Sequence, residues 1–383
     1  MSLPKVAVLI GTRPGIIKMA PIIHKLKKTR ADSLIIHTGQ HYSTSMDGNI
    51  MKDVQLNKPD YHIRRPVDCI THAQQTAYML VGIEEILLKE KPDVLLVCGD
   101  ANTNVAGALA ARKIHIKVAH VEAGLRSFDW RMPEEHNRII IDHISEYLFA
   151  PTSFAKEHLI RDGVIGQIFL VGNTIVEATW NHLEISKQNR NLESMGIDKD
   201  APHILLTLHR EENVDEEKIL GRILEAIKEI STSTKMNVLF PVHPRTKDRL
   251  RKFGANRIIE GVKYIQLLEP LSYLDFLLVL NSATVVLTDS GGVQEESCIL
   301  NVPCITLRES TERQETIDIG ANYLAGTQRA TIVQTFHDVF ARRLRSIHRL
   351  EPWRNPYGDG KASKRIVETC LYGRPEDEFS DVL

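Results

Sequence analysis

The chain has 383 residues, a length that predicts two domains of about 150–200 residues each. It carries 48 Lys and Arg against 49 Asp and Glu, so it lacks the basic field that a general nucleic-acid binder needs. The apolar share is 43%, and no apolar run approaches the ~20 residues of a membrane helix. We therefore expect a globular protein that binds neither nucleic acid nor membrane.

Short β-branched runs alternate with longer helical patterns along the chain. The strands expected in the first half are residues 6–11, 34–39, 94–99, 118–122, 147–150 and 169–172. Those expected in the second half are residues 204–209, 238–243, 264–267, 284–288 and 304–307. Fully apolar runs are typical of parallel strands covered on both faces. The pattern predicts an α/β protein with two doubly wound halves, whose ligands bind at the carboxyl ends of the strands.

One stretch interrupts this alternation. Residues 184–203 are polar, and we interpret them as an insertion or surface segment just past a crossing between domains. The five cysteines are scattered, and no pair has metal-ligand spacing. Cys98, Cys298 and Cys304 lie in apolar surroundings and are expected to be core thiols, which indicates a reducing, cytoplasmic setting.

The first polar cluster runs from Gly11 to Lys18, directly after the first expected strand. Gly11 and Pro14 form the turn, and Arg13 and Lys18 would stand at the start of the following helix. Cations at a helix N-terminus oppose the helix dipole, and an anionic ligand would relieve that conflict. The alternative is that both residues are solvated surface cations.

Three carboxylates follow the next expected strands. Asp100 comes after the strand at 94–99, where it also suits a helix N-cap. Glu122 ends a strand and closely precedes glycine, a poor place for a structural carboxylate. Glu134 follows Pro133, which is also a common way to begin a helix. Three carboxylates facing one cleft would suit general acid–base chemistry.

Two histidines follow strands of the second half. His209 can reach a phosphate or donate a proton. His243 lies close to two prolines, and the alternative for it is an ordinary turn histidine. Neither has a close paired ligand, so we expect no zinc site.

The most informative segment is residues 288–296, Thr-Asp-Ser-Gly-Gly-Val-Gln-Glu-Glu, after the strand at 284–288. Ser290, Gly291 and Gly292 open a helix whose unpaired N–H groups and dipole favour an anion. Glu296 lies about one and a half turns into that helix, where its carboxylate can accept ribose hydroxyls. Arg313 is expected to contact the phosphate or the uracil side. An ordinary strand–turn–helix with a glycine turn is the alternative.

Many short motifs occur in one order along the chain. They are Gly11-Thr12-Arg13-Pro14, Gly39-Gln40-His41, Gly99-Asp100, His120-Val121-Glu122-Ala123-Gly124-Leu125-Arg126, Pro133-Glu134-Glu135, Gly172-Asn173-Thr174, His209-Arg210, Pro241-Val242-His243, Thr288-Asp289-Ser290-Gly291-Gly292, Thr311-Glu312-Arg313 and Asn355-Pro356-Tyr357-Gly358-Asp359-Gly360. Over about residues 5–365 the chain resembles the non-hydrolysing UDP-N-acetylglucosamine 2-epimerase family. Each motif alone is weak, whereas the ordered set is specific.

The resemblance implies a GT-B architecture, with two Rossmann-like doubly wound domains and the active site in the cleft between them. The expected domains are residues 1–172 and 173–361, the second binding UDP, with a C-terminal helix at about 362–383 that packs back on the first. The family also implies a homodimer.

The family interconverts UDP-GlcNAc and UDP-ManNAc by eliminating UDP to 2-acetamidoglucal and adding it back, with no metal or nicotinamide cofactor. Its motifs would make Asp100, Glu122 and Glu134 the acid–base carboxylates and place His209 near the diphosphate. The substrate-binding residues implied by the resemblance are Arg13, Lys18, His243, Phe276, Ser290, Gly291, Gly292, Glu296 and Arg313.

The chain departs from the family pattern at several positions. Gly15 replaces a glutamate, Gln314 replaces a proline, and Ala101-Asn102 replaces a pair of threonines. Tyr42-Ser43-Thr44 stands where bacterial enzymes often have Arg-Gln-Met, a segment that serves their allosteric substrate site. We therefore expect weak or absent allosteric activation, or a modified substrate.

Four alternatives stay open beside a UDP-GlcNAc 2-epimerase. One is a 2-epimerase of a related UDP-sugar, such as a 2,3-diacetamido uronic acid derivative, and another is a hydrolysing 2-epimerase that releases free ManNAc. The remaining two are a GT-B glycosyltransferase and a UDP-sugar-binding protein without turnover, because fold alone does not decide function.

Overall fold

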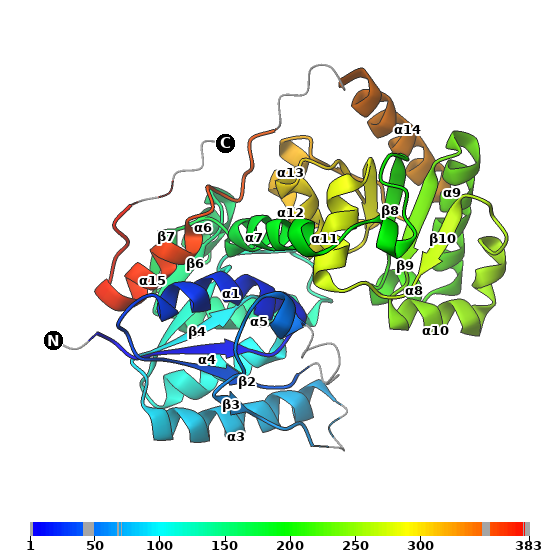
Figure 1. The fold of residues 1–383 in the computed structure, drawn as a ribbon. Helices are drawn as coiled ribbons and strands as arrows, with labels where there is room; N and C mark the ends of the chain where they lie inside the picture. The colour runs from blue at the N-terminus through cyan, green and yellow to red at the C-terminus, as the bar shows by residue number, and fades with distance from the viewer. Residues whose placement is uncertain are drawn as a thin grey trace. The chain divides into compact units, whose positions relative to one another are not determined.

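The computed structural model describes residues 3–40, 50–66, 69, 71–346, 353–377 and 379. Tyr42-Ser43-Thr44, on which the expected loss of allosteric activation depends, lies outside the described residues. The chain divides into two compact units, Met1–Trp180 with Pro356–Leu383, and Asn181–Asn355. Each unit contains one parallel β-sheet (Figure 1).

The first unit is built on a seven-stranded sheet. In spatial order its strands are β3 (Tyr61–His62), β2 (Ser33–His37), β1 (Val6–Ile10), β4 (Val94–Cys98), β5 (Lys117–Val121), β6 (Tyr147–Ala150) and β7 (Gln167–Leu170). Its helices are α1 (Arg13–Lys27), α3 (His72–Glu90), α4 (Asn102–Lys113), α5 (Pro133–Ile144), α6 (Ser153–Arg161), the start of α7 (Thr174–Asn189) and α15 (Ala362–Tyr372). From β1 the chain first adds β2 and β3 on one side and then β4 to β7 on the other, so the strand order reverses between β1 and β4.

The second unit has a six-stranded sheet of the same kind. Its strands in spatial order are β10 (Ile265–Leu268), β9 (Asn237–Pro241), β8 (His203–Thr207), β11 (Val285–Thr288), β12 (Cys304–Thr306) and β13 (Asn322–Leu324). Its helices are α8 (Glu211–Val214), α9 (Glu217–Thr234), α10 (Pro244–Phe253), α11 (Tyr273–Ser282), α12 (Gly291–Ile299), α13 (Gln314–Asp318) and α14 (Arg329–Ser346), with 3-10 turns η1 (Glu193–Met195) and η2 (Ala255–Ile258). Here the winding reverses between β8 and β11.

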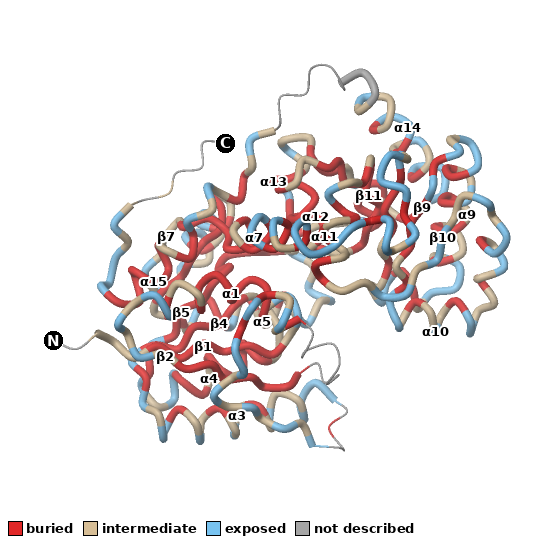
Figure 2. Tube along the Cα trace, in the orientation of Figure 1, coloured by how far each residue is buried: buried red, intermediate tan, exposed pale blue. Residues whose placement is uncertain are grey.

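The strands are buried on both faces, as is typical of parallel sheets whose connecting helices cover both sides. Every residue of β1 and β4 is buried, as the tube coloured by burial shows (Figure 2). One face of the first sheet packs its apolar side chains against α3, α4 and α5, through residues such as Met79, Ala106 and Ile141. The helix α15 packs against α1 within the same unit. The predicted α/β class with two doubly wound parallel sheets is confirmed.

The sequence prediction and the structure differ at short or polar elements. The strands β3 and β13 were not predicted, because two or three partly polar residues carry too little periodic signal. Of the two interpretations of residues 184–203, the surface segment is confirmed, because most of these residues are exposed. The stretch comprises the end of α7, the turn η1 and the link to β8, and so is not an insertion. No helix within the described part of the chain is long and apolar enough to cross a bilayer.

Two helical glycines allow a direct test of packing. A Cβ atom added at Gly107 in α4 would lie 2.2 Å from the Leu9 Cδ2 atom of β1, whereas one added at Gly221 in α9 would meet only Ile258, at 4.0 Å. We expect Gly107→Ala to destabilise the protein by about 1–3 kcal/mol through overpacking. The matched Gly221→Ala should be neutral or stabilise it by up to ~1 kcal/mol. Denaturant unfolding of both variants measures this, and an unaffected Gly107→Ala would contradict the packing described.

Candidate active site

The carboxyl ends of the neighbouring strands β4 and β5 carry two of the predicted carboxylates. Glu122 follows β5 directly, is 7% exposed, and has a backbone φ of 67°. A non-glycine residue in the left-handed region is strained by roughly 1–2 kcal/mol, and such strain clusters at functional sites. The strained backbone of Glu122 therefore makes this residue a candidate for the functional site.

Glu122 forms a buried ion pair with a lysine from another element. Lys18 of α1 places its Nζ atom 2.5 Å from Glu122 Oε1, and both side chains are almost completely buried. Asn173 Nδ2 donates to the same oxygen at 2.9 Å, and Cys98 Sγ lies 3.9 Å from Oε2. Lys18 and Glu122 are thus in direct contact, and the charge of the lysine balances that of the carboxylate.

Asp100 is paired with an arginine of α5. The guanidinium of Arg138 donates to Asp100 Oδ2 from Nε at 3.0 Å and from Nη2 at 2.6 Å. Asn137 donates its side-chain amide to the Asp100 carbonyl at 2.8 Å. The alternative of Asp100 as an N-cap is wrong, because α4 is preceded by Ala101 at the cap position and begins at Asn102. The side chain of Asp100 is 36% exposed and accessible to a substrate.

Glu134 lies in the first turn of the same helix that holds Asp100. Glu134 lies one turn before Arg138, so the same helix carries Glu134 and the arginine that binds Asp100. Within the described residues its carboxylate has no hydrogen bond or ion pair, in contrast to Asp100 and Glu122. The three carboxylates therefore differ: two are paired with buried cations, and Glu134 has no ionic partner within the described residues.

Arg13 occupies the first position of α1, on the exposed side of the turn that follows β1. Thr12 caps this helix by accepting a hydrogen bond from the Gly15 N–H at 3.3 Å. The turn therefore forms normally despite the glycine at position 15.

In the second unit, His209 is oriented by a buried aspartate. His209 follows β8, and its Nδ1 atom lies 3.2 Å from Asp289 Oδ1. Asp289 also accepts the backbone N–H groups of His209 and Arg210, at 3.0–3.1 Å, and the amide of Asn213 at 3.2 Å. Burial works to raise the pKa of Asp289, but these hydrogen bonds outweigh it and the pKa is lowered. An ionised Asp289 leaves His209 Nε2 as the ring nitrogen that can meet a ligand.

The helix α12 follows β11 after two intervening residues, and its N-terminus is the predicted anion site. Ser290 is its N-cap, but the Ser290 side chain makes no capping hydrogen bond, and the first turn contains no acidic residue. A Cβ atom at Gly292 would meet nothing within 4 Å, so the space beside this turn is open. At Gly291 the space is narrower, because an added Cβ atom would lie 3.2 Å from Glu312 Oε1. The N–H groups of the first turn and the open space beside Gly292 are features that a phosphate requires.

Arg313 lies beside the start of α12. Its Nε atom is 2.6 Å from Glu295 Oε1, and its Nη1 atom is 4.0 Å from Glu312 Oε1. A Cβ atom at Gly291 would lie 3.7 Å from Arg313 Nη2, so the guanidinium borders the helix N-terminus. Glu296 is 6% exposed in α12 itself. Arg313 is therefore near the predicted anion site while bound to two carboxylates.

The two remaining predicted residues take different places. His243 is the N-cap of α10, and its Nδ1 atom accepts the Arg245 N–H at 3.2 Å. Its ring centroid lies 5.4 Å from that of His209, so the structure brings the two histidines together. Phe276 is partly exposed in the first turn of α11, the helix that precedes β11.

Comparison with known proteins identifies the family. A family model described as UDP-N-acetylglucosamine 2-epimerase matches residues 24–371. The UDP-N-acetylglucosamine 2-epimerase of Methanocaldococcus jannaschii is 49% identical over 97% of this chain and 100% of that protein.

The chain belongs to the UDP-N-acetylglucosamine 2-epimerase family.

A solved structure of the same enzyme and one further relative are informative. A crystal structure of the M. jannaschii enzyme in complex with UDP-GlcNAc and UDP matches with a TM-score of 0.87 and 48% identity, over 95% of this chain and 98% of that one. The fold is thus the GT-B-like two-domain fold of the epimerase structures, as predicted. The UDP-2,3-diacetamido-2,3-dideoxy-D-glucuronate 2-epimerase of Pseudomonas aeruginosa is 38% identical over 95% of this chain and 98% of that enzyme.

Sequence reasoning did not identify the residues that orient the family's candidate site. Arg138, Asn173 and Asp289 hold Asp100, Glu122 and His209 respectively. Arg138 and Asn173 lie within the motifs that carry the resemblance, and Asp289 is next to Ser290. Their position in those motifs was the only sign in the sequence of a role at the site, because each of these residues is distant in the sequence from the side chain that it binds.

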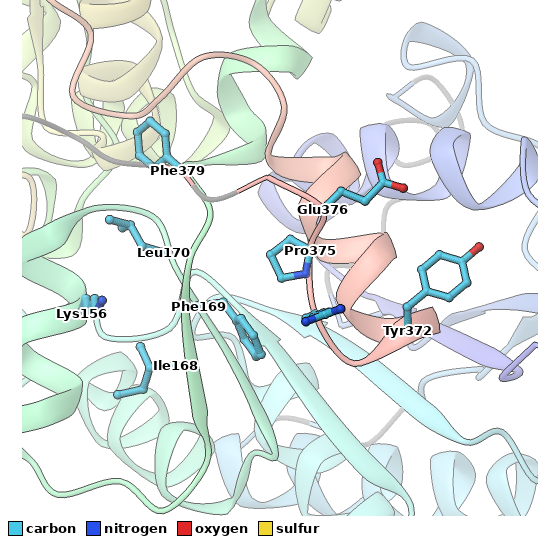
Figure 3. A pocket seen from close by; sticks show the side chains of 9 residues that line it. Lys156, Ile168, Phe169, Leu170, Tyr372, Pro375, Glu376 and Phe379 are labelled. Atoms are coloured by element: carbon cyan, nitrogen blue, oxygen red, sulfur yellow. The ribbon is translucent and has the colours of Figure 1, made fainter.

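A cavity of about 870 Å³ lies elsewhere in the first unit (Figure 3). It is bordered by β7, by α6 and by the segment that follows α15. The residues that line it are Lys156, Ile168, Phe169, Leu170, Tyr372, Arg374, Pro375, Glu376 and Phe379. None of the predicted site residues is among them, so it does not belong to the candidate active site.

A buried histidine at the end of β2 makes stability depend on pH. His37 is 3% exposed, its ring stacks on that of His62 with 4.9 Å between centroids, and its Nδ1 atom accepts the Gly39 N–H at 3.0 Å. Burial, with a smaller effect of the charge of His62, lowers the pKa of His37 to about 4. The folded protein therefore keeps this ring neutral where the unfolded chain, with a pKa of about 6.5, binds a proton.

The free energy of unfolding should accordingly fall as pH drops from about 6.5 to 4, by up to about 3 kcal/mol from His37 alone. We expect His37→Gln to remove this part of the decline, while His143→Gln, at an exposed position of α5, should leave it unchanged. Urea unfolding at a series of pH values measures the difference. An identical pH dependence for wild type and His37→Gln would contradict the assignment.

Proposed function

We propose that the protein is a UDP-N-acetylglucosamine 2-epimerase that interconverts UDP-GlcNAc and UDP-ManNAc without metal or nicotinamide cofactor. The observation that carries the proposal is the presence of all three carboxylates, at the ends of β4 and β5 and the start of α5, in a chain that is 49% identical to a 2-epimerase over 97% of its length. The first unit would supply the acid–base groups, and the second would bind UDP.

The charge pairing of the carboxylates suits an elimination. A carboxylate removes the proton from carbon 2, the bond between carbon 1 and the diphosphate oxygen breaks, and its electron pair leaves with UDP. Positive charge develops at carbon 1, where nearby anions stabilise it. Return of the proton to the opposite face of 2-acetamidoglucal and re-addition of UDP complete the inversion. Asp100 and Glu122, each matched with a cation, supply stable anions, and Glu134 supplies an uncommitted one.

The second unit offers what a departing diphosphate needs. The N–H groups of Gly291 and Gly292 would donate hydrogen bonds to its oxygens, and Glu296 would accept those of the ribose hydroxyls. Ser290, whose own N–H donates to Thr288 Oγ1 at 3.0 Å, would contribute its hydroxyl group. His209, oriented through Asp289, would donate from Nε2 to a phosphate oxygen. Arg13, Lys18, His243, Phe276 and Arg313 complete the proposed substrate-binding set.

A second substrate is supported by one specific observation. The 2-epimerase of UDP-2,3-diacetamido-2,3-dideoxy-D-glucuronate from P. aeruginosa is 38% identical over nearly the full length. The same carboxylate chemistry applies to that sugar, because it also carries an acetamido group at carbon 2. We propose it as the next substrate to test.

The proposal includes a cytoplasmic homodimer. All five cysteines are free and buried, which fits a reducing compartment. Val81 and Leu88, seven residues apart on α3, are 59% and 53% exposed, and Ile140 on α5 is 40% exposed. Both helices belong to the layer on one face of the first sheet, so these apolar side chains offer a surface that a second copy would cover.

The epimerisation is tested by incubating the protein with UDP-GlcNAc in D2O, without metal or NAD, and following carbon 2 by NMR. We expect deuterium at carbon 2 together with UDP-ManNAc. Asp100→Asn, Glu122→Gln and Glu134→Gln should each reduce turnover at least 100-fold, a loss of about 3 kcal/mol of transition-state stabilisation, while UDP still binds. Glu157→Gln, at an exposed position of α6, serves as the control.

Free ManNAc with UDP would instead indicate the hydrolysing reaction. Absence of exchange with UDP-GlcNAc and with the diacetamido uronate would contradict the proposed activity, and unchanged turnover in all three variants would contradict the role of the carboxylates.

The nucleotide site is tested by calorimetric titration with UDP. We expect Ser290→Ala and Glu296→Ala each to weaken UDP binding about 5–30-fold, because each removes hydrogen bonds worth ~1–2 kcal/mol. Ser194→Ala, in the exposed turn η1, should bind UDP as the wild type does. Unaltered affinity in both test variants would place the nucleotide elsewhere.

Light scattering of the purified protein tests the homodimer. We expect twice the mass of one chain for the wild type, and a monomer for the double variant Val81→Asp, Leu88→Asp, because charge on the apolar surface prevents its burial. Ile165→Asp, at a 96% exposed position outside this surface, should stay dimeric. A monomeric wild type would rule out the homodimer.

A further inference from the structure

His120 lies at the centre of a buried polar chain that no part of the proposed chemistry uses. It belongs to β5 and is 0% exposed. Its Nδ1 atom is 2.7 Å from Asp142 Oδ1, on α5, and its Nε2 atom is 3.1 Å from the carbonyl oxygen of Gly99, at the end of β4. One ring therefore links three elements of the first unit.

Both neighbours of the ring are acceptors. A backbone carbonyl can only accept a hydrogen bond. The other oxygen of Asp142 lies 2.7 Å from the Nη1 atom of Arg126 and accepts the Gly124 N–H at 3.2 Å, so Asp142 is an ionised carboxylate. A neutral imidazole has one donor nitrogen and would turn a lone pair toward one of these oxygens. The ring satisfies both contacts only when each nitrogen carries a hydrogen.

The polar chain continues from Asp142 toward the protein surface. Arg126, whose side chain is 2% exposed, also pairs with Asp162 at 2.8 Å. The side chain of Asp162 is 26% exposed, so solvent screens its charge. With His120 protonated, the chain of His120, Asp142, Arg126 and Asp162 contains two cations and two anions.

His37 shows the opposite arrangement in the same sheet. Its Nδ1 atom accepts the Gly39 N–H at 3.0 Å, and this contact requires a lone pair on that nitrogen. His37 and His120 are both buried. The two rings therefore differ in their partners: His37 faces a backbone N–H donor, whereas His120 faces a carboxylate and a carbonyl oxygen.

We propose that His120 is a positioning residue that acts as a buried imidazolium and fixes the three segments that bear the carboxylates. Its Nε2–H holds the peptide carbonyl immediately before Asp100. Asp142, held by Nδ1–H, lies about two turns after Glu134 on α5 and also anchors the Gly124 N–H, two residues after Glu122. The left-handed backbone of Glu122 is thereby held from both sides.

NMR of the full-length protein labelled with ¹⁵N-histidine tests the protonation state. At pH 7 we expect a ring with two protonated, slowly exchanging nitrogens whose resonances are absent from the spectrum of His120→Gln. The ring of His37, assigned through His37→Gln, should have an unprotonated Nδ1 and serves as the internal reference. Should His120→Gln fail to fold, Asp142→Asn provides the assignment, because loss of the carboxylate shifts the same resonances. A neutral tautomer for His120 would overturn the proposal.

The positioning role rests on the proposed epimerase activity and is tested by kinetics. We expect His120→Gln to lower kcat at least 100-fold, because small displacements of catalytic groups are costly, with KM and the Kd for UDP within about twofold of wild type. His143→Gln, at an exposed position of the same helix α5, is the matched control and should be unchanged. An unaltered kcat in folded His120→Gln would overturn the role. A wild type inactive on every UDP-sugar would reject the proposed function instead, while the NMR result would still decide the protonation state.

Discussion

Charge balance inside the first unit is the constraint on which the candidate site depends. A carboxylate buried at the end of a strand is tolerated only with a partner of opposite charge or several donors. Glu122 has Lys18 at 2.5 Å, and Asp142 has Arg126 at 2.7 Å. Each partner comes from a different element, so the ion pairs fix the elements relative to one another as well as balancing the charges. The carboxyl ends of the parallel strands can therefore concentrate acidic groups without unfolding the sheet.

The second unit presents the start of a helix where the first presents paired carboxylates. The start of α12 has no acidic residue in its first turn and no side-chain cap, and the space beside Gly292 is open. The Glu312 carboxylate and the Arg313 guanidinium both border Gly291, and Arg313 is matched with Glu295 and Glu312. Side chains of the same unit therefore pair the charges beside this helix.

The histidines show how the same side chain takes different roles under different partners. Asp289 lies beside one ring nitrogen of His209, burial lowers the pKa of His37 and a backbone N–H donates to its ring, and two acceptors surround His120. None of these roles follows from the residue type, since histidine changes charge within the physiological range. The roles follow from which donors and acceptors the fold places around each ring.

The sequence by itself determined the class of the fold and the identity of the acidic residues. Fully apolar runs separated by helical patterns predict buried parallel strands, and all eleven predicted strands are present, with ends shifted by a residue or two. Asp100, Glu122 and Glu134 were identified because each stands at the end of a strand or the start of a helix within an ordered set of motifs. Local periodicity and turn chemistry are encoded over a few residues, and such signals can be interpreted without coordinates.

Only the tertiary structure decided what each of these residues touches. Lys18 contacts Glu122, which is 104 residues away in the sequence, and Asp289 contacts His209, which is 80 residues away. The two-residue β3 and the end of α7 were also missed or misassigned, because tertiary packing rather than local pattern forms them. Hydrogen bonds and ion pairs depend on distances of a few ångströms between distant segments. The sequence pattern records which side chains are available, and the packing of the sheets decides which of them become partners.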